Sequence, residues 1–124
     1  MQLWFLNIVK TDIGRMYMKE KIMLKELIAS IPSRICLTSD LWTSINIEGF
    51  ISLTSHFVDL NRKLNTKLLN FCHMPPPYTG FELSKKINDF LQNWGLEKKM
   101  FSMTLDNASA NDVLQKTLKR QLIL

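Results

Sequence analysis

The first part of the hydrophobic pattern predicts a helix over residues 15–30. These residues are strong helix formers with charges interleaved. Met23, Leu27 and Ile31 recur at helical spacing and form part of an apolar stripe. Pro32 predicts the end of this helix, because proline disfavours the helical conformation of the residue before it.

Beyond the proline, the pattern changes to that of β-strands. Residues 34–43 and 49–59 are rich in β-branched and aromatic residues. The second segment alternates, with Phe50, Ser52, Thr54 and His56 on one face and Ile51, Leu53, Ser55 and Phe57 on the other. Turns at 46–49 and 60–63 and a third strand at 64–74 complete the pattern. Three strands joined by short turns predict an antiparallel meander.

A second helix is predicted after the proline tract at 75–77. Thr79 and Glu82 have the spacing of a capping box, and Gly95 suits the C-terminal cap. The apolar positions between them follow helical spacing: Leu83, Ile87, Phe90, Leu91 and Trp94. Residues 100–106 then resemble a short buried strand. A last helix, capped by Ser109 or Asn111, would place Val113, Leu114, Leu118 and Leu122 on one face.

The predicted order α-β-β-β-α-β-α indicates a mixed-sheet α/β fold. Three consecutive strands, a crossover helix and a fourth strand form the opening of a ribonuclease-H-like sheet, without its last strand and further helices. We therefore expect a partial fold of that type. Residues 1–32 are interpreted as an N-terminal segment and helix leading into the domain, and residues 33–124 as the incomplete domain.

Composition narrows the class of protein. The chain has 124 residues, 46% of them hydrophobic, which is enough for one domain with a real core. The formal net charge of +5 is compatible with an anionic partner but does not require one. No apolar run approaches a membrane span, and the opening residues lack the features of a signal peptide. Cys36 and Cys72 are interpreted as reduced, buried thiols of an intracellular protein.

Two aspartates are the main candidates for chemistry. Asp40 and Asp106 each fall at or near the carboxyl end of a predicted strand, and the crossover implies that these strands are neighbours. Two close carboxylates repel unless a cation neutralises them, so the pairing suggests a divalent metal and two-metal phosphoryl transfer. The alternative is that each aspartate forms a turn or caps a helix.

Three strings of the sequence resemble the hAT-superfamily transposases. They span residues 31–44, 69–80 and 104–112 and occur in the family's order. The likeness is greatest to plant members of the Ricesleeper and Daysleeper type, which carry a BED zinc finger. It extends from about residue 19 to residue 122, which is most of the chain.

The resemblance implies a piece of a ribonuclease-H-like catalytic domain. Asp40 and Asp106 match the first two acids of the family's Asp-Asp-Glu triad, with Mg²⁺ or Mn²⁺ as the expected metal. The glutamate, the DNA-binding BED finger and the dimerisation region of the family have no match in these residues. The resemblance therefore implies an internal fragment that is inactive alone. The complete protein would be nuclear, would act on DNA at transposon ends, and would dimerise through regions outside this sequence.

Weaker candidates surround the two acids. Trp42 projects to the same strand face as Asp40 and could stack on a base, although a core role is the alternative. Lys98 and Lys99 could contact phosphates. Asn107 could hold the two acids in place without itself binding the metal. The spacing of the histidines and cysteines argues against zinc, so His73 is expected to make a local hydrogen bond beside the prolines.

The sequence is also compatible with two alternatives to a transposase fragment. The chain could be a domesticated relative that binds DNA or regulates transcription in the nucleus without catalysis. It could also be a non-functional remnant of a decayed element, for which poor stability is expected because an incomplete sheet leaves an unpaired edge.

Overall fold

The computed structural model describes residues 2–43, 48–106, 112, 115–117 and 119–120. By its internal contacts the chain divides into two compact units, Met1–Pro32 and Ser33–Leu124. The first unit contains helix α1 (Gln2–Ser30). The second contains the following elements: β1 (Ile35–Thr43), β2 (Gly49–Val58), β3 (Leu64–Met74), α2 (Gly80–Trp94) and β4 (Met100–Leu105).

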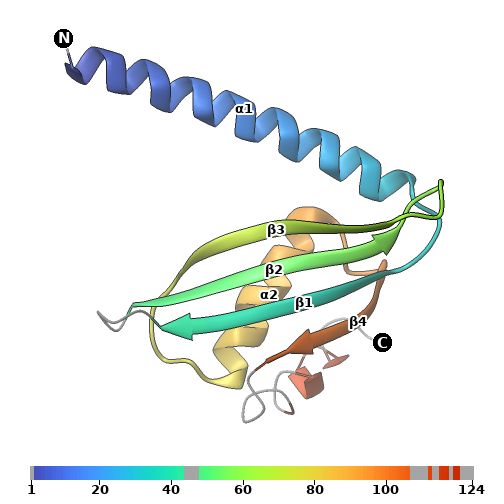
Figure 1. Cartoon of the computed structure of the whole chain (residues 1–124). Coiled ribbons are helices and arrows are strands. Elements are labelled where there is room, and N and C mark those ends of the chain that lie inside the picture. Colours follow the sequence, from blue (N-terminus) through green and yellow to red (C-terminus); the bar gives the residue numbers. More distant parts are fainter. Residues whose placement is uncertain (1, 44–47, 107–111, 113–114, 118, 121–124) are drawn as a thin grey trace. The chain divides into compact units, whose positions relative to one another are not determined.

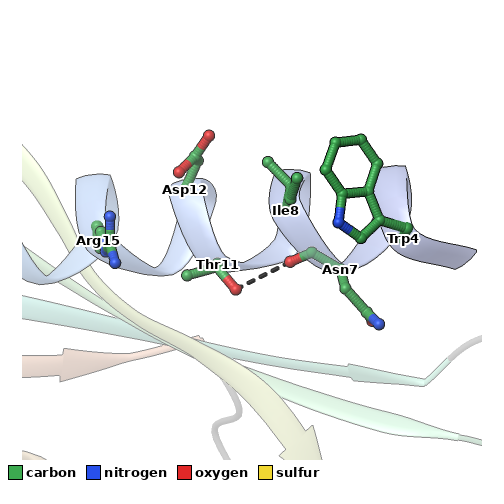
Figure 2. A pocket seen from close by; sticks show the side chains of 6 residues that line it. All are labelled: Trp4, Asn7, Ile8, Thr11, Asp12 and Arg15. Carbon is green, nitrogen blue, oxygen red and sulfur yellow. Dashed lines mark hydrogen bonds between the residues drawn. The ribbon is translucent and has the colours of Figure 1, made fainter.

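Helix α1 is almost twice as long as the sequence predicted. It begins at Gln2 rather than near residue 15 and is 29 residues long. In its first half, further exposed apolar residues such as Leu3, Trp4 and Phe5 surround those at helical spacing, so no single apolar stripe stood out. Figure 2 shows one face of α1, a shallow groove lined by Trp4, Asn7, Ile8, Thr11, Asp12 and Arg15. On this face the hydroxyl of Thr11 donates to the carbonyl oxygen of Asn7 at 2.9 Å.

The second unit is built on a mixed sheet with strand order β3-β2-β1-β4 (Figure 1). β1 and β2 pair antiparallel, as do β2 and β3, which confirms the predicted meander. β4 pairs parallel with β1, which confirms the predicted crossover. The mixed α/β class inferred from the sequence is therefore correct.

Helix α2 supplies the core that covers one face of this sheet (Figure 1). Its predicted apolar positions are all buried, and they meet buried strand residues at alternate positions, among them Ile35, Leu37, Ile51, Leu53 and Phe57. We call this side the covered face. The indole N–H of Trp94 donates to the side-chain oxygen of Asn70 at 2.7 Å, which ties the end of α2 to β3.

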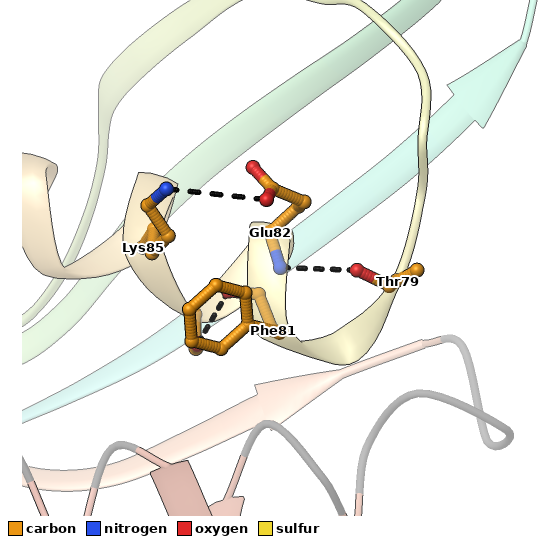
Figure 3. A network of polar contacts seen from close by, with 5 residues as sticks. Thr79, Phe81, Glu82 and Lys85 are labelled. Atoms are coloured by element: carbon orange, nitrogen blue, oxygen red, sulfur yellow. Dashed lines mark hydrogen bonds and ion pairs between the residues drawn. The ribbon is translucent and has the colours of Figure 1, made fainter.

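The ends of α2 follow the predicted capping chemistry. The hydroxyl of Thr79 accepts a hydrogen bond from the backbone N–H of Glu82 at 3.2 Å (Figure 3). The carboxylate of Glu82 lies 3.9 Å from the Lys85 ammonium. Gly95 closes the helix with a φ of 67°, the left-handed conformation that glycine adopts without strain.

A tight turn joins β2 to β3. The carboxylate of Asp59 accepts hydrogen bonds from the backbone N–H groups of Asn61 and Lys63 and from the side-chain amide of Asn65, each at 2.9 Å. These bonds, led by that from Lys63, lower the pKa of Asp59 because they stabilise the charged carboxylate. The turn thus fixes the β2–β3 connection through one side chain.

The opposite side of the sheet, which we call the open face, is formed by the alternate strand positions. Most of its side chains are half-buried or exposed. Cys36 belongs to this face, and both Cys36 and Cys72 are free and half-buried. Both thiols are therefore less buried than expected, and Cys36 takes the outward position of its strand.

Parts of two predicted features lie outside the described residues. Residues 46 and 47 of the first turn fall there, as do the capping residues Ser109 and Asn111 of the last helix and all four positions of its predicted apolar face. The described residues between 112 and 120 are helical.

Candidate functional site

The strand pairing brings Asp40 and Asp106 to adjacent positions. Ser39 of β1 is paired with Leu105 of β4, and each aspartate is the next residue of its chain segment. Because these strands run parallel, extending the register by one residue sets Asp106 beside Asp40. Neighbouring strands lie about 4.8 Å apart, so the two backbones approach closely at this point.

Both aspartates are exposed. Asp40 lies on the open face, opposite Ser52 of β2. By alternation, the position after the buried Leu105 also belongs to that face. The buried Ser39 anchors the strand beside Asp40, since its hydroxyl donates to the carbonyl oxygen of Ser52 at 2.7 Å. The site is therefore accessible to solvent, and the hydrogen bond between β1 and β2 holds the strand that carries Asp40.

Asp40 lies near the carboxyl end of its strand, as predicted. β1 continues for three residues beyond it to Thr43, because these residues still pair with the start of β2. Asp106, by contrast, directly follows the end of β4. One carboxylate thus projects from a strand interior and the other from a strand end.

A cluster of aromatic side chains lies on the open face next to Asp40. The ring of Trp42 is 6.2 Å from that of Phe50 and 5.4 Å from that of Phe71, centroid to centroid. His73 meets the Phe50 ring edge-on at 5.8 Å. We call these four residues the aromatic cluster. Trp42 is 40% exposed and Phe71 is 56% exposed, so the cluster presents aromatic surface to solvent.

This cluster settles two expectations about individual residues. Trp42 projects from the same face as Asp40, as the strand alternation predicted, and it is not a fully buried core residue. Among the described residues, His73 makes a ring contact, and the hydrogen bond expected beside the prolines is not present. The reason is the β2–β3 register, which sets His73 opposite Phe50.

A polar bridge that the sequence analysis missed crosses the open face. Nε2 of His56 lies 3.0 Å from the hydroxyl of Thr38, and Nδ1 lies 3.2 Å from the hydroxyl of Thr66. One imidazole therefore links β1, β2 and β3 on the face that carries Asp40. Alternation alone had placed His56 on this face, but the register of three strands was needed to find its partners.

The weaker sequence candidates lie away from the two acids or outside the description. Lys98 and Lys99 precede β4, whereas Asp106 follows it, so the strand separates them from the acid pair. Lys98 is exposed and Lys99 is half-buried. Asn107 lies outside the described residues.

The donor set fits a hard divalent cation in part. Carboxylate oxygens are the ligands that Mg²⁺ and Mn²⁺ prefer, and Mg²⁺ commonly binds through one or two carboxylates while keeping several waters. Asp40 and Asp106 supply such a pair on an exposed face. Within the described part of the chain, no group of three or more His, Cys, Asp or Glu residues could hold a metal ion.

The mixed sheet and its parallel crossover strand are consistent with a partial RNase-like domain. The chain matches the family model of the ZBED1 RNase-like domain over residues 38–124, and it belongs to that family. The resemblance found in the sequence is thereby confirmed. No helix in the described ranges is long and apolar enough to cross a membrane.

Individual relatives point to the same group. The zinc finger BED domain-containing protein RICESLEEPER 2 of Oryza sativa subsp. japonica is 34% identical over 112 residues, which is 90% of this chain. DAYSLEEPER of Arabidopsis thaliana is 33% identical over 88% of the chain. The putative AC transposase of Zea mays is 35% identical over 79% of the chain. The chain is thus related to transposases and BED zinc finger proteins, and it spans 12–16% of the length of these relatives.

Proposed function

We propose that this chain forms part of a nuclear, DNA-acting domain in which Asp40 and Asp106 hold a divalent cation for DNA strand cleavage and transfer. The observation that carries the proposal is the parallel β1–β4 register, whose last pair is Ser39 and Leu105, the residues that directly precede the two acids. The relationship to transposases supports the choice of DNA as substrate.

The role of each residue follows from its position. When bound, Mg²⁺ or Mn²⁺ would supply charge neutralisation and activation of an oxygen nucleophile. Asp40, held by the β1–β2 pairing, would fix one side of the ion, and Asp106 at the end of β4 would close the other. Two carboxylates leave most of the coordination to water, so we expect these 124 residues to bind the cation weakly and not to cleave DNA alone.

A metal titration tests this proposal. We expect Mn²⁺ to broaden the amide NMR signals of residues around Asp40 and Asp106 in the wild-type chain, because a paramagnetic ion acts locally. Asp40→Asn or Asp106→Asn should raise the dissociation constant at least about tenfold, since each removes a ligand. Asp89→Asn is the matched control, because Asp89 is an exposed aspartate on α2.

The outcomes of this titration separate the alternatives. Equal broadening in the wild type and in both site variants would place the ion elsewhere. An absence of local broadening in the wild type would remove the metal site altogether. In either case the proposed cleavage chemistry fails.

The second candidate is a DNA-binding or regulatory protein without catalysis. It is favoured by the aromatic cluster beside Asp40 on the open face, which contains the partly exposed Trp42. In this case the aromatic cluster matters more than the carboxylates. Trp42 presents a partly exposed ring on which an unpaired base could stack.

A single-stranded DNA titration tests this role of the aromatic cluster. Trp42→Ala is expected to weaken binding of an oligonucleotide about fivefold or more, which is the order of one lost stacking contact. Phe81→Ala is the control, because Phe81 is an exposed aromatic residue on α2, away from the open face. Binding should also weaken steeply with added salt. Equal losses in both variants, or no binding at low salt, would contradict the proposal.

A further inference from the structure

Helix α1 carries an exposed apolar seam that the proposed function does not use. Leu6, Ile13, Met16 and Met23 are 54–67% exposed and Leu27 is 39% exposed. With the half-buried Val9, they follow alternating steps of three and four residues along the helix. This is the spacing of the a and d positions of a coiled coil, and we call the set the α1 seam. Glu20 takes the one remaining position between Met16 and Met23.

We propose that the α1 seam pairs antiparallel with the α1 seam of a second copy of this chain. A stripe of large exposed apolar side chains on one helix calls for a partner that removes it from water. An identical helix offers the same spacing over the whole seam, and its charges decide between the two possible directions.

A parallel pair would be unfavourable at Glu20. In parallel coiled coils, each core position faces the same position of the partner helix. The two Glu20 carboxylates would then meet inside the seam, where like charges repel and burial is costly. A parallel pair also brings no opposite charges together at the flanking positions, because Asp12 and Lys19 would face Tyr17 and Leu24 of the second copy.

An antiparallel pair resolves these conflicts. With Ile13 packed against Met16 of the second copy, Glu20 comes level with Val9 and beside Lys10 of that copy. The flanking Asp12 then meets Lys19 of the second copy, and the two-fold symmetry repeats each contact. Each charged residue at or beside the middle of the seam thus lies near an opposite charge of the second copy. This charge complementarity favours the antiparallel arrangement.

Sedimentation of the complete 124-residue chain tests the pairing. We expect a concentration-dependent dimer of twice the 14.5 kDa chain mass. Ile13→Asp should abolish the dimer, because it buries an unpaired charge in the seam. Lys19→Asp should raise the dissociation constant about tenfold, since it replaces two opposite-charge contacts with like-charge ones.

The charge swap makes the test specific. Asp12→Lys combined with Lys19→Asp restores opposite charges only in the antiparallel pair, so this double variant should recover most of the lost affinity. Arg15→Asp is the matched control, because Arg15 lies on the groove face of α1 and not on the seam (Figure 2). Circular dichroism of each variant should show unchanged helix and sheet.

Cross-linking then fixes the direction. A mixture of Ile13→Cys and Met16→Cys chains should form a disulfide-linked pair faster than either variant alone, with the wild-type chain as the control for Cys36 and Cys72. A monomer at all concentrations would overturn the proposal, as would a dimer that survives Ile13→Asp. Faster cross-linking of Ile13→Cys with itself would also overturn it, because in the proposed pair Ile13 faces Met16 of the second copy and not Ile13.

Discussion

Replacing Leu91 with alanine is expected to lower the free energy of unfolding of the second unit by about 2–5 kcal/mol. Leu91 is fully buried and lies on the face of α2 that packs against the sheet. The substitution removes buried methyl groups and leaves a cavity that the surrounding side chains fill only in part. The loss is large against the total stability of a domain of this size, which is about 5–15 kcal/mol.

Denaturant unfolding followed by tryptophan fluorescence measures this effect. Trp94 is buried one helical turn from Leu91 and reports on the same interface. Leu64→Ala is the matched control, because Leu64 on β3 is 73% exposed and its truncation should change stability by less than about 0.5 kcal/mol. Similar losses in both variants would mean that α2 does not form the core of this unit. A non-cooperative transition in the wild-type chain would favour the interpretation of the chain as a decayed remnant.

The sequence predicted the elements that carry clear local signals, such as helix caps, prolines and strand composition. The bounds of β3 and α2 followed from strand composition, the proline tract and the caps at Thr79 and Gly95. Each of these signals is local, since it depends on neighbours within about four residues. The first half of α1 carried no such signal. Leu6, Val9 and Ile13 keep helical spacing there, but the apolar residues around them hide that spacing from a pattern read along the sequence alone.

The sequence predicted which strands of the candidate site are neighbours, but it did not predict which side chains touch across them. The crossover implied that the strand of Asp40 and the strand before Asp106 are neighbours, and β1 and β4 do pair in parallel. The aromatic cluster and the His56 bridge depend on the pairing of β1, β2 and β3, and the β2–β3 pairing includes an irregularity between Leu53 and Thr54. A shift of one residue changes which side chains meet, and no local pattern fixes such a shift.

A close contact between Tyr78 and Gly49, near the candidate site, predicts the second large effect on the free energy of unfolding. The ring of Tyr78, which follows the proline tract, lies directly over Gly49 at the start of β2. A Cβ atom at residue 49 would overlap the Oη, Cε1 and Cζ atoms of that ring. Gly49→Ala is therefore expected to lower the free energy of unfolding by about 1–3 kcal/mol, because the ring or the strand must move. Gly14→Ala is the contrasting control: nothing lies within 4 Å of that site on α1, and alanine should favour the helix.

A double-mutant cycle identifies the cause of the Gly49 effect. In a Tyr78→Leu background, Gly49→Ala should cost less than about 1 kcal/mol, since the ring atoms that it meets are gone. Gly49 pairs with Thr43 and Met74, next to the positions of Trp42 and His73. We therefore expect Gly49→Ala also to shift the NMR signals of the aromatic cluster, whereas Leu64→Ala should leave them in place. An equal cost in both backgrounds would contradict the clash and would locate the requirement for glycine in the backbone of β2 instead.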